Sequence, residues 1–182
     1  MVHYFDIIET SNSAFFIRRK FGQPLSEVIP QEPSLYTEEK FWITYQLCYA
    51  LHSLHKINIF HGDLKPSNIL YVPSGRIYIV DPAPFKPYML DQYHPHYYYY
   101  FFANDDSLGC YLAPERLLGT SLPALMESNN IMVNDLILAD LFSLGCIIAY
   151  MYLNGEPLFS SDTARKYGKG ELTDEIENTL ST

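Results

Sequence analysis

The feature that most constrains the fold of this chain is a polar loop between a helical segment and two short apolar runs. The loop and the start of the first run read His61-Gly62-Asp63-Leu64-Lys65-Pro66-Ser67-Asn68-Ile69-Leu70. The runs cover residues 69–72 and 77–80, and Pro73-Ser74-Gly75 joins them, which predicts a β-hairpin. The loop is therefore expected to be fixed at one end by a helix and at the other by a strand.

The remaining segments predict an α+β fold that is mostly helical. We expect a buried strand at Ala14–Ile17 and a short helix at Leu25–Ile29, followed by a long helix capped by Thr37. Apolar residues at helical spacing mark the buried face of that long helix: Ile43, Leu47, Ala50, Leu51 and Leu54. An irregular stretch is predicted from Asp81 to about Ala113, and a strongly apolar helix from Leu141 to Leu153.

Composition excludes several classes of protein. The 182 residues are 48% apolar, so the chain can bury a core and is not a disordered segment. The net charge of −9 disfavours nonspecific binding to nucleic acid or to an anionic membrane. Three widely spaced cysteines indicate a reducing compartment and no zinc site.

No targeting signal is visible in these residues. The N-terminus lacks the order of a signal peptide, no run of eighteen apolar residues occurs, and Val2 stands where N-myristoylation needs glycine. We expect any contact with a membrane to come through partners or through sequence outside this chain.

The residue types in the polar loop suit phosphoryl transfer. A carboxylate can orient an acceptor hydroxyl, while a cation and metal ions meet the migrating charge. Asp63 is then the catalytic base, Lys65 contacts the transferring phosphate, and Asn68 is a ligand of Mg²⁺. An isolated Asp-x₄-Asn pair is more often structural, with both side chains bonded to backbone.

Three further motifs follow in order, and together they favour the catalytic interpretation of the polar loop over the structural one. Asp81 comes directly after the second apolar run, where it could complete a Mg²⁺ site, although an Asp-Pro turn would explain it equally. The other two are Tyr111-Leu112-Ala113-Pro114-Glu115-Arg116 and the helical run from Ala139 to Ile148.

With these motifs the chain resembles the large lobe of eukaryotic protein kinases. His61-Gly62-Asp63 matches the catalytic loop, Asp81-Pro82-Ala83 the metal-binding position and Ala113-Pro114-Glu115 the end of the activation segment. More closely, the chain is similar to the protein-kinase-like regulatory subunits of class III phosphatidylinositol 3-kinase complexes, which act in vacuolar protein sorting. The segments that carry this similarity are Phe85-Lys86-Pro87, Tyr97 to Phe102, Cys110 to Arg116, Asp140 to Ala149 and Gly155 to Phe159.

The resemblance implies a division of the chain and a set of site residues. Residues 1–24 would be the end of the small lobe and the hinge, and residues 25–182 an incomplete large lobe. ATP and Mg²⁺ would be the cofactors. The main chain of Arg18 and Lys20 would face the adenine edge, with Leu70 as the floor beneath it. The arginine that usually pairs with Glu115 would lie beyond residue 182.

The chain also departs from the family. It contains neither a Gly-x-Gly-x-x-Gly loop nor the Val-Ala-x-Lys motif, so we expect the isolated chain to be inactive. Gly62 replaces the arginine with which many kinases sense activation-loop phosphate, and Pro82 replaces a phenylalanine. Residues 104–106 are acidic where the related subunits are basic, which argues against phosphate docking there.

Three other features are given structural or binding roles. His61 is expected to pack and hydrogen-bond within the loop. Asp140, placed at the start of a helix, would accept backbone N–H bonds from the catalytic loop. The aromatic run Tyr97 to Phe102 is expected to bury against a partner or against the lobe itself, and contact with the lipid kinase subunit is preferred over a role as phosphorylation targets.

Three functions remain open at this point. The first is a serine/threonine kinase domain that partners the class III lipid kinase subunit and its sorting and autophagy adaptors. Such a protein would be cytoplasmic and would reach endosomal, vacuolar or autophagic membranes only through the complex. The second is a pseudokinase scaffold that docks and restrains the lipid kinase. The third is a small-molecule phosphotransferase of the aminoglycoside or choline kinase type, to which Ala113-Pro114-Glu115 and the Asp140 helix are foreign.

Overall fold

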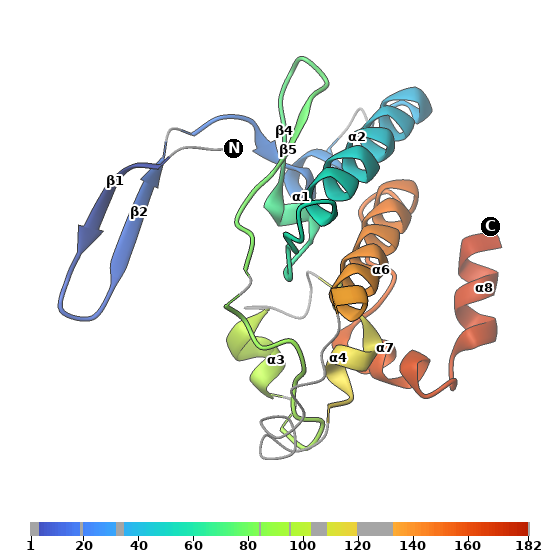
Figure 1. The fold of residues 1–182 in the computed structure, drawn as a ribbon. Helices are drawn as coiled ribbons and strands as arrows, with labels where there is room; N and C mark the ends of the chain where they lie inside the picture. Colours follow the sequence, from blue (N-terminus) through green and yellow to red (C-terminus); the bar gives the residue numbers. More distant parts are fainter. Residues whose placement is uncertain are drawn as a thin grey trace.

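The described part of the chain forms two small antiparallel sheets and a set of helices (Figure 1). The computed structural model describes residues 4–18, 20–31, 35–83, 85–94, 96–102, 109–119 and 133–181. Strands β1 (Tyr4–Glu9) and β2 (Ala14–Arg18) form a hairpin that projects to one side of the helical body. The predicted strand at Ala14–Ile17 forms as β2, but the prediction that it is buried is wrong, because the hairpin projects from the body and leaves Phe15 and Phe16 exposed.

The second sheet has the order β3-β4-β5 and supports the polar loop. Strand β3 (Gln23–Pro24) leads into the short helix α1 (Leu25–Val28) and pairs with β4 (Ile69–Tyr71), where Pro24 lies opposite Leu70. Strand β4 pairs in turn with β5 (Ile77–Ile79), which confirms the predicted hairpin. The turn closes through the Gly75 N–H bond to the Val72 carbonyl, with Gly75 at φ 78°.

Helix α2 (Thr37–His55) precedes the polar loop and fixes the position of the hairpin. Gln46 holds the hairpin through its side chain, whose Nε2 donates to the Gly75 carbonyl at 2.9 Å and whose Oε1 accepts from the Ile77 N–H at 3.3 Å. Thr37 is the first helical residue and Tyr36 is the cap, so the predicted Thr37 cap is wrong. The Glu39 carboxylate, in the third helical position, accepts the N–H of the cap residue Tyr36 at 2.9 Å.

The core lies between α2 and the long helix α6 (Val133–Tyr152), which run alongside each other. Ile43, Leu47 and Leu51 from α2 and Ile147 and Met151 from α6 are all almost completely buried. Helix α6 is long and apolar enough to cross a membrane by length and composition, but it is the central core helix here. It begins well before Leu141, so Asp140 lies inside the helix and not at its start, which corrects the prediction.

The stretch predicted as irregular contains a helix, α3 (His96–Phe101). Aromatic residues are modest helix formers, and the burial of Tyr98 and Phe102 explains why a helix forms there. The chain continues through the 3₁₀ turn η1 (Pro66–Asn68) in the polar loop and, later, through α4 (Pro114–Leu117). The last helices are α7 (Ser161–Gly168) and α8 (Thr173–Ser181), and Ser160 caps α7 by accepting the Thr163 N–H at 3.1 Å.

Candidate active site

Asp140, on helix α6, holds the start of the polar loop through hydrogen bonds. Its carboxylate accepts the backbone N–H of His61 at 2.8 Å and of Gly62 at 3.0 Å, and it contacts Nε2 of His55 at 3.0 Å. Asp140 is almost completely buried, so these bonds provide the partners that a desolvated carboxylate needs. The loop that carries Asp63 is therefore tied directly to the core helix α6.

His61 bridges the loop and the end of β5. Its Nε2 lies 2.9 Å from the Val80 carbonyl, and its Nδ1 accepts the N–H of Asp63 at 3.3 Å. These two bonds require a neutral ring with the proton on Nε2. Burial lowers the pKa of His61 below its usual 6.5, although the Val80 carbonyl and nearby carboxylates oppose this. The ring thus orients the backbone of the loop.

Asp63 and Asn68 are brought together within the loop. The Asn68 amide nitrogen donates to the Asp63 carbonyl at 2.7 Å, and it lies 3.5 Å from the Asp63 carboxylate. Because this nitrogen is engaged, the Asn68 amide oxygen is the atom that would meet a cation. The Val80 N–H donates to the Asn68 carbonyl at 2.9 Å, so pairing of the hairpin strands positions the residue that precedes Asp81.

The Asp81 carboxylate is bound to Arg18 from β2. The two guanidinium nitrogens lie 3.2 and 3.1 Å from its two oxygens, a bidentate arrangement. Asp81 adopts φ 58°, an uncommon backbone conformation for a residue that is not glycine. In the structure Arg18 meets this site through its side chain, whereas the sequence predicts a main-chain contact to adenine.

The residues predicted to hold the nucleotide base are not among the described residues that line the cavity beside Asp63. Arg18 ends the projecting hairpin, Lys20 is exposed, and Leu70 is buried in the middle strand of the second sheet. None of these three residues lines the cavity beside Asp63. Their role as the adenine site stays a prediction.

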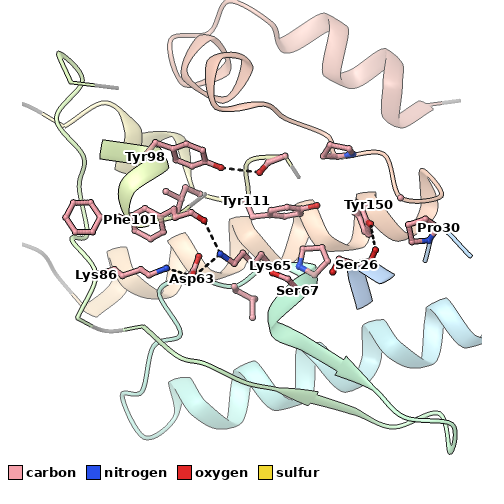
Figure 2. Close-up of a pocket in the computed structure, with 17 residues that line it drawn as sticks. Ser26, Pro30, Asp63, Lys65, Ser67, Lys86, Tyr98, Phe101, Tyr111 and Tyr150 are labelled. Atoms are coloured by element: carbon pink, nitrogen blue, oxygen red, sulfur yellow. Dashed lines mark hydrogen bonds and ion pairs between the residues drawn. The ribbon is translucent and has the colours of Figure 1, made fainter. Parts of the chain in front are cut away.

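Two lysines share one oxygen of Asp63. Figure 2 shows them pointing toward the carboxylate from two sides, with Lys86 Nζ 2.6 Å and Lys65 Nζ 3.1 Å from Oδ2. Lys65 also donates to the Phe102 carbonyl at 3.0 Å. Sequence reasoning gave no role to Lys86, and the Phe85-Lys86-Pro87 motif was the only signal for it.

Arg116 connects the polar loop to the segment that carries Lys86. It donates to the carbonyls of Gly62 at 2.8 Å, Tyr88 at 2.7 Å and Pro87 at 3.2 Å. Its guanidinium carbon lies 5.1 Å from the centre of the Phe102 ring. Sequence reasoning also missed this buried cation, whose signal is a basic residue directly after Ala-Pro-Glu.

Gly62 is required by the backbone at this point. It adopts φ 75°, and a Cβ atom added there would lie 3.1 Å from the Ala83 carbonyl oxygen. A side chain would therefore strain the loop. Nη1 of Arg116 donates to the Gly62 carbonyl at 2.8 Å, so a guanidinium from outside the loop contacts this glycine.

A cavity of about 450 Å³ opens beside Asp63 (Figure 2). The polar loop, α3 and the segment before α4 contribute to its walls, together with residues in or near α1 and the end of α6. Tyr98 on its wall donates to the Gly109 carbonyl at 3.1 Å, and Tyr150 donates to the Ser26 carbonyl at 3.4 Å. The candidate base thus faces a cavity with aromatic and cationic walls.

The aromatic run divides between core and surface. Tyr98 and Phe102 are 3% and 6% exposed and belong to the core, whereas Tyr100 is 79% exposed. The interpretation of the whole run as a partner surface is therefore wrong for Tyr98 and Phe102, because α3 turns them inward.

Glu115 on α4 is exposed. Arg19 and residues 104–106 lie outside the described residues.

The residue types fit a magnesium–nucleotide site only in part. Asn68 and Asp81 offer the oxygen ligands that Mg²⁺ prefers, but Arg18 holds the Asp81 carboxylate. Among the described residues, no group of three or more His, Cys, Asp or Glu side chains could hold a metal ion. Binding of Mg²⁺ at Asp81 would require Arg18 to be displaced.

Comparison with known proteins gives the same family as the motifs. The protein kinase domain family matches residues 1–181. Similar proteins include the putative serine/threonine-protein kinase VPS15 of Komagataella pastoris, 32% identical over 95% of this chain and 13% of its own length. The probable serine/threonine-protein kinase vps15 of Dictyostelium discoideum is 36% identical over 94% of this chain and 8% of its own.

A third relative is the serine/threonine-protein kinase VPS15 of Saccharomyces cerevisiae, 32% identical over 92% of this chain and 11% of its own length. The chain thus spans roughly a tenth of the length of these relatives. The match of nearly the whole chain, together with the geometry around Asp63, shows that the chain belongs to the protein kinase family.

Proposed function

We propose that this chain is the large-lobe part of a serine/threonine protein kinase domain in a regulatory subunit of a class III phosphatidylinositol 3-kinase complex. The observation that carries the proposal is the placement of Asp63. Asn68 bonds to its carbonyl, Asp140 holds the backbone of the same loop, and Asp63 faces a cavity beside Lys65. The relatives named VPS15 support the assignment to this group of kinases.

In the proposed reaction Asp63 accepts a hydrogen bond from the acceptor hydroxyl. It would take the hydroxyl proton as the oxygen–phosphorus bond to the acceptor forms and the bond between the terminal phosphorus of ATP and its bridging oxygen breaks, with ADP as the leaving group. Lys65 places its ammonium beside the same carboxylate, where it can meet the charge of the transferring group. ATP would supply the phosphoryl group, and Mg²⁺ held by Asn68 and Asp81 would neutralise its charge.

Positioning is the main contribution of these residues. Alignment of the reacting groups can supply about 7 to 11 kcal/mol of a barrier. The 182 residues contain no glycine-rich loop or Val-Ala-x-Lys motif to hold the phosphates from above. We therefore propose that the isolated chain has no appreciable activity and that a longer protein is required.

A pseudokinase scaffold is the second candidate function. The bidentate pair of Arg18 with Asp81 favours it, because this pair occupies the carboxylate that a metal ion would need. In that case the domain would dock and restrain the lipid kinase without binding nucleotide. Membership of the protein kinase family removes the third candidate, the small-molecule phosphotransferase.

Partners and location follow from the same proposal. The partners would be the lipid kinase catalytic subunit and its sorting or autophagy adaptors. The protein would be cytoplasmic and would lie on endosomal, vacuolar or autophagic membranes only through that complex.

Nucleotide binding by the full-length protein tests the proposed function. Titration with a fluorescent ATP analogue, with and without Mg²⁺, should show binding that Mg²⁺ strengthens and that Asn68→Ala weakens. The exposed Asn134→Ala on α6 is the matched control. Absence of nucleotide binding under both conditions would support the scaffold instead.

A further inference from the structure

The ammonium group of Lys86 contacts the carboxylate of the candidate base Asp63. It lies 2.6 Å from Oδ2 of Asp63 and 4.9 Å from the centre of the Phe102 ring. The Lys86 side chain is only 18% exposed. An acceptor hydroxyl that bonds to this oxygen of Asp63 must therefore compete with Lys86.

The backbone around Lys86 is held in place on both sides. Its own N–H donates to the Ala83 carbonyl at 3.1 Å. The carbonyls of the next two residues, Pro87 and Tyr88, both accept hydrogen bonds from the buried Arg116. Because the main chain is fixed, a ligand that binds at this site is expected to move the flexible Lys86 side chain and to leave the backbone in place.

The described residues that line the cavity carry more positive than negative charge. Lys65 and Lys86 both line it, and Asp63 is the one acidic residue among its described lining residues. This local balance of two cations to one anion is opposite in sign to the net charge of −9 on the whole chain. A ligand with a negative group complements the cavity.

An incoming hydroxyl changes the partner of Lys86. If the hydroxyl takes the Asp63 oxygen, the half-buried ammonium loses its closest anion, which is costly unless another anion replaces it. An acidic side chain near the acceptor hydroxyl would provide that replacement. A neutral peptide would leave Lys86 on Asp63 and would bind less well.

We propose that Lys86 is a specificity-determining residue that selects acceptor peptides with a carboxylate close to the acceptor serine or threonine. Lys86 holds Asp63 in the free protein and transfers its ammonium to the peptide carboxylate on binding. This inference rests on the proposed function, since it concerns the acceptor peptide of that same site.

Peptide binding to the full-length protein tests the inference without requiring catalysis. Two fluorescein-labelled peptides carry one serine flanked either by Glu or by Gln, and fluorescence anisotropy gives their dissociation constants. The wild-type protein should bind the Glu peptide at least tenfold more tightly, which corresponds to about 1.4 kcal/mol. Lys86→Met should bring the ratio close to one.

Matched variants keep the test independent of folding. Lys86→Arg should retain the preference because it keeps the cation, and Lys56→Met should leave it unchanged because Lys56 is exposed at the end of α2. Lys86→Gln provides a second neutral variant if Lys86→Met does not fold. A preference that survives in the neutral variant, or a wild-type protein without preference or without binding, would overturn the inference.

Phosphoryl transfer to the same peptides separates this inference from the proposed function. Lys86-dependent binding without transfer would contradict only the kinase activity. Transfer to both peptides at equal rates and with equal affinities would contradict only the role of Lys86.

Discussion

The Asp140 carboxylate accepts the backbone N–H of His61 at 2.8 Å, although the two residues lie 79 positions apart in the sequence. Asp140 belongs to the core helix α6 and His61 begins the loop that carries Asp63. The position of the candidate base therefore depends on the packing of α6.

Replacing Asp140 should destabilise the domain strongly. Asp140→Ala leaves the N–H groups of His61 and Gly62 without this acceptor, and each unsatisfied buried donor costs about 1 to 3 kcal/mol. We expect a loss of about 3 kcal/mol in the free energy of unfolding, and a smaller loss for Asp140→Asn, whose amide oxygen still accepts. Urea unfolding of a kinase-domain fragment that includes residues 1–182 measures both.

The exposed Asn134→Ala on the same helix is the control and should change the stability by less than about 0.5 kcal/mol. A loss for Asp140→Ala as small as that of the control would show that the bonds to the loop are not important.

The burial of His61 should make the domain less stable in mild acid. Burial lowers the pKa of His61 in the folded state, while the unfolded chain keeps a value near 6.5. Below pH 6.5 the unfolded chain binds a proton that the folded chain does not. Stability from this group is therefore complete above pH 6.5 and is lost as the pH falls from there toward the folded pKa, by up to about 1.4 kcal/mol per pH unit.

Unfolding midpoints at pH 7.5 and 5.5 check this effect. His61→Gln should reduce the difference between the two midpoints, because glutamine can still donate to the Val80 carbonyl but does not titrate. His52→Gln, at an exposed position on α2, is the control and should leave the difference unchanged. If both variants behave like the wild type, His61 does not cause the acid sensitivity.

Removal of the Arg116 guanidinium should loosen the segment that carries Lys86. Arg116→Met takes the donor away from the carbonyls of Gly62, Pro87 and Tyr88, and we expect a cost of about 2 to 4 kcal/mol. Arg116→Lys should be intermediate, since an ammonium cannot reproduce the planar set of donors. Hydrogen exchange over residues 85–94 should become faster in both variants.

Arg76→Met, at an exposed position in the turn of the β4–β5 hairpin, is the control for loss of an arginine. Exchange over residues 85–94 that stays at the wild-type rate in Arg116→Met would contradict the connecting role of Arg116.

Tyr100 should contribute to binding of the lipid kinase subunit, whereas Tyr98 should contribute to stability. Tyr100 is 79% exposed, and covering its apolar area at about 25 cal/mol per Å² favours association. Tyr100→Ser should lower recovery of the lipid kinase subunit several-fold in a pull-down without changing the thermal unfolding midpoint. Tyr98→Ser should lower that midpoint, because Tyr98 is buried and bonds to Gly109.

Tyr93→Ser, which removes another exposed tyrosine outside the run, controls for a general effect of surface aromatics. Recovery of the partner by Tyr100→Ser at the wild-type level would exclude this surface.

Local patterns predicted the elements that hold the polar loop. The apolar periodicity of Ile43, Leu47 and Leu51 and the turn at Gly75 depend on neighbours in the sequence, and both elements appear as expected. The start of α6 was missed because Asp140 was interpreted as a cap, although it is a buried acceptor inside the helix. Helix α3 was missed because its aromatic residues form a helix only when tertiary packing buries Tyr98.

In the site, too, the sequence predicts contacts between neighbouring residues but not contacts between residues far apart in the chain. Asp63 and Asn68 are five residues apart, so their bond follows from the short loop that the sequence predicts. Lys86 and Arg116 reach the loop across 23 and 54 residues, and no periodicity shows such contacts. The cations around Asp63 therefore became visible only in the folded chain.

Phosphoryl transfer by the full-length protein and its Asp63→Asn variant tests whether Asp63 is the catalytic base. With labelled ATP and Mg²⁺, we expect transfer to a serine peptide by the wild type and at least a 100-fold lower rate for Asp63→Asn, because general-base catalysis contributes about 10²- to 10⁴-fold. Asp162→Asn, an exposed carboxylate on α7, should retain the wild-type rate. Equal rates for the wild type and Asp63→Asn, or no transfer by either, would contradict the assignment of Asp63 as the catalytic base.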